Sequence, residues 1–239
     1  VPFENAWLKD IAATNSQMKV VHTDHGIKKL EMAAHHHHDE GEHHEHGHHK
    51  EEHSEGAHHE AMHDHDKVAH DEDHHDHTGL DPHIWLSPSL VKIQARTILS
   101  SLQEVDPAHK TIYESNFNSF MKEIDKLDAD LKKIFSGKEG SQFMVFHPSW
   151  GYFAHEYGLK QVPIEIEGKD PKPAQLKELI KHAREKGVKV IFVQPQFSLK
   201  SAKVVAQEID GQVAFADPLA EEWAANLYKV ADKFKAVLK

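Results

Sequence analysis

Three absences limit what this chain of 239 residues can be. It has no cysteine, which excludes disulfides and thiolate metal sites and is compatible with an oxidising compartment. No apolar run approaches the roughly 20 residues that a membrane-spanning helix needs. No basic patch or basic amphipathic helix indicates a nucleic acid or an anionic membrane surface as the partner. The chain opens on Val1 without a signal-peptide pattern, and we expect this not to be its natural N-terminus.

One segment, residues 35–77, holds the net charge and most of the histidines. It contains 14 Asp or Glu against two Lys, a net charge of −12, whereas the whole chain carries −11. Apolar residues almost vanish in it, so it cannot bury enough surface to offset the entropy of ordering, and we expect a disordered loop. Its imidazoles are candidate auxiliary, low-affinity zinc ligands, and a solvated polar linker is the alternative. These 18 histidines are His35, His36, His37, His38, His43, His44, His46, His48, His49, His53, His58, His59, His63, His65, His70, His74, His75 and His77.

The rest of the chain predicts helices followed by alternating strands and helices. Ser87-Pro88 is a typical helix start, and apolar residues then recur every three or four positions from Tyr113 to Ile134, which predicts a helix of about six turns. The run 18–21 is strand-like. Four successive strand–helix units predict an α/β fold with a parallel sheet covered by helices on both sides. We expect strands at 143–146, 161–166, 188–193 and 212–216, and helices at 150–157, 173–186, 199–209 and 221–238.

Three residues at loop junctions are candidate ligands. Ligands of parallel sheets bind beyond the carboxyl ends of the strands, where His147 and Asp217 are expected, and His83 lies just before a helix start. Each has a simpler alternative. His83 could belong to a turn and His147 to the core, while Asp217 before Pro218 is typical of a helix N-cap.

Short motifs around these residues resemble those of the zinc and manganese solute-binding family, ZnuA-like. The resemblance extends to 167–171 and 187–198 and covers nearly all of the chain outside the His-rich segment. It implies two α/β lobes with parallel sheets, joined by one long helix, and one metal ion bound between the lobes. The motifs are Gly-Leu-Asp-Pro-His-Ile-Trp-Leu-Ser-Pro at 79–88, Phe-His-Pro-Ser-Trp-Gly-Tyr-Phe at 146–153 and Ala-Asp-Pro-Leu-Ala at 216–220.

The resemblance assigns the roles of metal ligands to His83, His147 and Asp217. The family's first histidine ligand would precede Val1, so we expect at most three of four protein ligands and an incomplete N-terminal lobe. Imidazoles with a carboxylate favour Zn²⁺, whereas manganese sites favour more oxygen ligands. Glu165 and Glu167 are candidate acceptors that would orient a ligand imidazole.

The expected domains follow the same resemblance. Residues 1–105 would form the partial N-terminal lobe with the loop 35–77, residues 106–137 the long linking helix, and residues 138–239 the C-terminal α/β lobe.

The predicted function is the extracytoplasmic zinc-binding component of an ABC-type zinc uptake transporter. The resemblance implies delivery of zinc to a permease powered by an ATPase, and we expect a monomer, periplasmic or membrane-anchored in a bacterium. We expect no enzymatic activity, because a closed shell of protein ligands leaves no open position for a substrate water. One alternative is a manganese-importing or adhesin-like member of the same family. Others are a zinc buffer in which the loop is the function, and a zinc hydrolase using the His-Glu-x-x-His pattern. That pattern occurs at 44–48 and 59–63, but it has catalytic meaning only on a packed helix, so we discount it.

Overall fold

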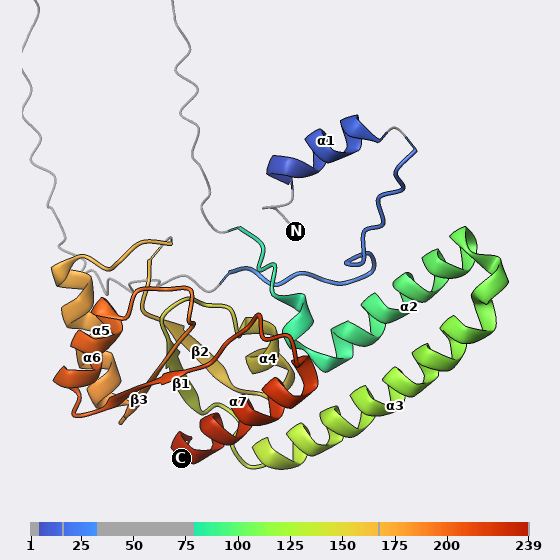
Figure 1. Cartoon of the computed structure of the whole chain (residues 1–239). Coiled ribbons are helices and arrows are strands. Elements are labelled where there is room, and N and C mark those ends of the chain that lie inside the picture. Colours follow the sequence, from blue (N-terminus) through green and yellow to red (C-terminus); the bar gives the residue numbers. More distant parts are fainter. Residues whose placement is uncertain (1–4, 16, 33–78, 167, 239) are drawn as a thin grey trace, which may run out of the picture. The chain divides into compact units, whose positions relative to one another are not determined.

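The computed structural model describes residues 5–15, 17–32, 79–166 and 168–238 (Figure 1). These residues belong to one unit. The His-rich segment 35–77 and Glu167 lie outside the described residues, so the expectations for them stay predictions. The division into two lobes and a linking helix also stays a prediction.

Every regular element described before the sheet is a helix. Helix α1 (Asn5–Thr14) is followed by a stretch without regular structure, and the strand expected at 18–21 is wrong. Val20 and Val21 are 41% and 37% exposed, and a short apolar run forms a strand only where another strand pairs with it. In the described part of the chain before α2, the only pairing is an isolated bridge between Glu31 and Leu80.

Two long helices follow as an antiparallel pair. After the short 3-10 helix η2 (Ile84–Leu86), Ser87 caps α2 (Pro88–Val105) by accepting a hydrogen bond from the amide of Leu90 at 3.3 Å. The turn η3 (Pro107–His109) leads into α3 (Lys110–Phe135), whose 26 residues span about 39 Å. Figure 1 shows α3 returning alongside α2 toward the sheet, and the long helix expected from the apolar stripe is confirmed.

A four-stranded parallel sheet forms the second half. Its strand order is β2-β1-β3-β4, and every pairing is parallel, which confirms the α/β prediction. The first strand has the expected length, one residue earlier in the chain, and the other three are shorter than expected. The second and fourth strands end early because the residues after them leave the sheet to build loops, and the third begins two residues later than expected. The elements are β1 (Gln142–Val145), α4 (Gly151–Glu156), β2 (Lys160–Pro163), α5 (Pro173–Glu185), β3 (Val190–Val193), α6 (Lys200–Glu208), β4 (Gln212–Phe215) and α7 (Trp223–Val237).

Both faces of the sheet are covered by helices, as expected from the four successive strand–helix units. Phe143 and Val145 point to a core shared with α3, α4 and α7, where Phe234 stacks on Phe143 with ring centroids 4.3 Å apart. Met144 points to a second core shared with α5 and α6. The sheet is therefore held rigidly, and its carboxyl edge is a fixed platform for the loops that follow the strands. In the part of the chain that the structure describes, no helix is both long and apolar enough to cross a bilayer.

Candidate metal site

His147 and Glu165 meet at the carboxyl edge of the sheet because of strand register. Val145 pairs with Pro163, and His147 and Glu165 each lie two positions beyond the end of their strand. The Nδ1 atom of His147 lies 2.6 Å from Oε1 of Glu165, whose side chain is only 5% exposed. Phe197 stacks on the imidazole at 4.8 Å with an interplanar angle of 17°. The ring is thereby fixed on one edge by a carboxylate and on one face by an aromatic side chain.

His83 is held by a second buried carboxylate, from Asp81. Oδ1 of Asp81 accepts the backbone N–H of His83 at 2.9 Å and lies 2.7 Å from Nδ1 of its ring. Asp81 in turn is tied to α4, since the Tyr152 hydroxyl donates to the Asp81 carbonyl at 2.9 Å. Burial raises the pKa of the Tyr152 hydroxyl, so this donor keeps its proton.

The two imidazoles lie next to each other in an edge-to-face arrangement. Their ring centroids are 5.4 Å apart with an interplanar angle of 71°. Because an ionised carboxylate can only accept, Nδ1 of each ring is the donor in these bonds, and in a neutral ring Nε2 is then the nitrogen with a free lone pair. A histidine ligated through Nε2, with its other nitrogen bonded to a carboxylate, is the usual arrangement in zinc sites. Both histidines therefore have the Nδ1 contact that is typical of zinc ligands, and their role as ligands stays a prediction.

Asp217 lies on a neighbouring loop but is held by other contacts. Its Oδ1 accepts hydrogen bonds from Nε2 of Gln196 at 3.2 Å and from the backbone of Leu219 at 3.0 Å. The loop is joined to the His83 loop because the Trp85 indole donates to the carbonyl of Pro218 at 2.8 Å. Helix α7 begins only at Trp223, so Asp217 opens a turn and the N-cap alternative is wrong.

No three-ligand cluster is assembled within the described ranges. Among those residues no group of three His, Cys, Asp or Glu side chains is close enough to hold a metal ion. His83 and His147 are thus brought together as a pair, while the participation of Asp217 stays a prediction. A third ligand could arise in two ways. The Asp217 carboxylate could leave its present hydrogen bonds, or another group could enter the site.

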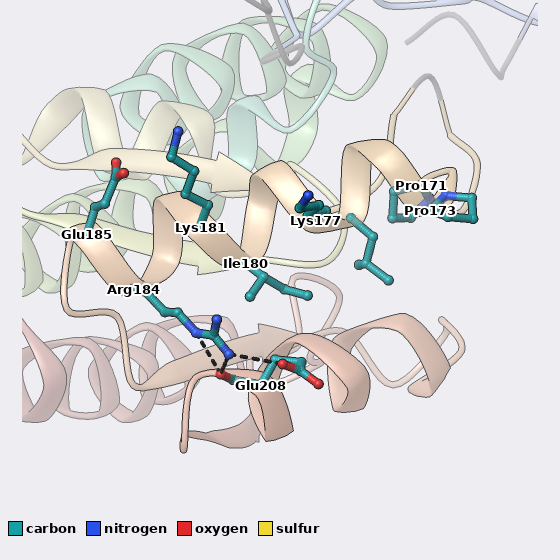
Figure 2. Close-up of a pocket in the computed structure, with 9 residues that line it drawn as sticks. Pro171, Pro173, Lys177, Ile180, Lys181, Arg184, Glu185 and Glu208 are labelled. Carbon is teal, nitrogen blue, oxygen red and sulfur yellow. Dashed lines mark hydrogen bonds and ion pairs between the residues drawn. The ribbon is translucent and has the colours of Figure 1, made fainter.

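A separate pocket of about 590 Å³ lies between α5 and α6 (Figure 2). Apolar side chains such as Ile180 line it together with Lys177 and Lys181. At its rim Arg184 donates to both the carbonyl and the carboxylate of Glu208. No imidazole of the described residues lines this pocket, so it does not offer the nitrogen ligands of the histidine pair.

Of the two carboxylates that contact the imidazoles, Glu165 was predicted from the sequence and Asp81 was not. Glu165 does contact an imidazole, that of His147, as expected, while the ligand role of that imidazole stays a prediction. Asp81 was not anticipated, although an aspartate two residues before a ligand histidine is a signal that could have found it. His155 is exposed and His182 bonds to Gln142 at 3.1 Å, so neither joins the pair.

Comparison with known proteins gives a consistent family. A family model described as ZnuA, zinc-uptake complex component A, periplasmic, matches residues 1–236. The high-affinity zinc uptake system protein ZnuA of Bacillus subtilis is 35% identical over 142 residues, which are 59% of this chain and 44% of the relative. The zinc-binding protein AdcA of Streptococcus pyogenes is 30% identical over 141 residues, 58% of this chain and 27% of the relative. The chain therefore matches less than half of the length of these relatives.

Solved structures agree. A crystal structure of ZnuA is 38% identical with a TM-score of 0.79 and covers 99% of this chain and 77% of that one. A ZnuA deletion mutant solved with zinc bound is 36% identical with a TM-score of 0.77, covering 99% and 75%. The laminin-binding protein Lmb of Streptococcus agalactiae, described as having adhesin and metal-transporting activity, is 29% identical with a TM-score of 0.62, covering 67% and 65%.

Proposed function

This chain belongs to the ZnuA family of periplasmic zinc-uptake components, and on that premise we propose that it captures Zn²⁺ at His83 and His147 for delivery to a membrane transporter. The observation that carries the proposal is the edge-to-face pair of imidazoles, 5.4 Å apart, each with a carboxylate at Nδ1. In that arrangement each carboxylate occupies Nδ1, which leaves the Nε2 atom of each ring as the nitrogen that could bind zinc. Zinc is the cargo here, and the proposal includes no chemical reaction.

We propose Asp217 as the third ligand. Zinc takes four ligands in a tetrahedron, and two imidazoles leave two positions to fill. The tie between Trp85 and Pro218 keeps the Asp217 loop beside His83, and the present partners of its carboxylate are neutral donors that water can replace. A carboxylate also offsets the positive charge that zinc brings into a partly buried site.

The proposed location is extracytoplasmic, either periplasmic or anchored at the membrane. The proposed partners are the permease and the ATPase of an ABC-type transporter, with the chain acting as a monomer. Relatives described as zinc-uptake proteins support this assignment. The similarity to Lmb supports an adhesin-like, metal-transporting member as the second candidate.

Metal preference tests the proposed function. We expect the full chain to bind Zn²⁺ at least about tenfold more tightly than Mn²⁺, because nitrogen ligands favour zinc and oxygen ligands favour manganese. The measurement is competition between the two ions at equal concentration, followed by metal analysis of the protein. Manganese retained in preference to zinc would instead support the manganese-importing alternative, and retention of neither metal would refute a metal-uptake role.

A second prediction concerns the carboxylate behind His147. Glu165→Gln keeps the shape of the side chain but removes the charge that orients and polarises the imidazole. We expect the zinc affinity to fall about tenfold, at the lower end of what loss of such a partner costs. Glu208→Gln is the matched control, because Glu208 is exposed and pairs with Arg184 on α5. Equal zinc affinity of the Glu165→Gln and Glu208→Gln variants would show that Glu165 does not support the site.

A further inference from the structure

Helix α4 supports the loop that carries His83 through several contacts. Near its start, the Tyr152 hydroxyl donates to the carbonyl of Asp81 and accepts the backbone N–H of Leu30, both at 2.9 Å. At its end, the Glu156 carboxylate accepts a hydrogen bond from the Ser87 hydroxyl. The same helix begins at Gly151, four residues after His147, so it is close in sequence to one imidazole and hydrogen-bonded to the loop of the other.

Gly151, the first residue of α4, lies against the carboxylate of Asp81. A methyl group on Gly151 would lie 2.6 Å from Oδ2 of Asp81, closer than real contacts allow. Gly151 is not among the glycines with a positive φ, so its backbone conformation is open to other residues. The position therefore needs the space that glycine leaves rather than its conformational freedom.

We propose that Gly151 is a positioning residue for zinc binding, because its missing side chain lets Asp81 seat against α4 and so sets His83 opposite His147. The inference rests on the proposed function of the histidine pair. Asp81 is 1% exposed and holds both the backbone and the ring of His83, so it cannot move without moving the imidazole. Zinc accepts a nitrogen ligand only at about 2.0–2.1 Å, which makes the site sensitive to a small displacement of one ring.

The test is a set of glycine-to-alanine variants of the full chain. We expect Gly151→Ala to lower the zinc affinity at least about tenfold, as expected when the partner of a ligand is displaced. Gly79→Ala is the control without a clash, since nothing lies within 4 Å of its added methyl group. Gly211→Ala is the control with a clash, because its methyl group would lie 2.6 Å from the Lys189 carbonyl, at the opposite edge of the sheet. It should lower the midpoint of thermal unfolding without lowering the zinc affinity of the folded protein.

A double-mutant cycle separates positioning from general damage. Asp81→Ala removes the carboxylate that the methyl group would meet, so Gly151→Ala should add less than about a threefold loss of affinity in that background. Additive losses would overturn the proposal, as would a Gly151→Ala variant with the affinity of the original chain. If Gly151→Ala alone does not fold, the double variant decides. Recovery of a folded protein supports the steric contact with Asp81, and failure to recover overturns it.

The His147→Ala variant distinguishes failure of the proposed function from failure of the proposed role of Gly151. Zinc affinity is measured by competition with a chelator, and His147→Ala reports whether the measurement detects the histidine pair. If His147→Ala has no effect, the proposed function fails. If His147→Ala lowers the affinity and Gly151→Ala does not, only the positioning role of Gly151 fails.

Discussion

Replacing His147 by alanine lowers the zinc affinity of the site at least about a hundredfold, and His83→Ala does the same. Loss of a residue that only orients a ligand costs about 10-fold to 100-fold, and loss of the ligand itself removes a coordinate bond as well. The rings are 5.4 Å apart, so a zinc ion left with one of them loses the second nitrogen of the pair. Chelator competition on the full chain measures the affinity of the tightest zinc equivalent.

A double variant and a matched control test whether the two imidazoles bind the same zinc ion. His83→Ala and His147→Ala together should cost little more than either alone, because a single imidazole does not form a tight site. His155→Ala is the control, since His155 is an exposed histidine on α4. Equal losses in the His155→Ala variant, or fully additive losses in the double variant, would show that the two imidazoles do not act on one ion.

Much of the fold around this site could be predicted from the sequence. The alternation of strands and helices predicts the parallel sheet, and parallel strands bring the residues after them to one edge. His147 and Glu165 therefore meet once Val145 pairs with Pro163. The long α3 was also predictable, because its apolar stripe has the helical period throughout.

Other features depend on tertiary contacts that local patterns do not encode. The strand expected at 18–21 fails for want of a pairing segment among the described residues, and strand propensity alone does not supply one. Asp217 resembles a helix cap by composition, yet the helix begins six residues later. The need for glycine at position 151 arises from a carboxylate 70 residues away in the sequence, which no local pattern reveals.

Removing the His-rich segment should lower the zinc stoichiometry without lowering the affinity of the tightest equivalent. Residues 35–77 contain 18 His, and zinc takes four ligands, so with imidazoles as the ligands we expect about four weakly bound equivalents from the segment. The composition of the segment predicts disorder, and a disordered segment would have to order itself to bind, so we expect each of its equivalents to be weaker than that at His83 and His147. Equilibrium dialysis against a range of zinc concentrations measures both quantities.

A variant with all 18 segment histidines changed to glutamine separates the role of imidazole from that of length and charge. It keeps the 14 carboxylates and the spacing of the chain, and we expect it to lose the weak equivalents as the deletion does. If the glutamine variant retains them, carboxylates bind the extra zinc and the histidines of the segment are not its ligands. If the deletion variant retains them, the extra zinc binds elsewhere. Adding His147→Ala to the deletion variant should remove the remaining tight equivalent, because only the segment and the histidine pair are expected to hold zinc.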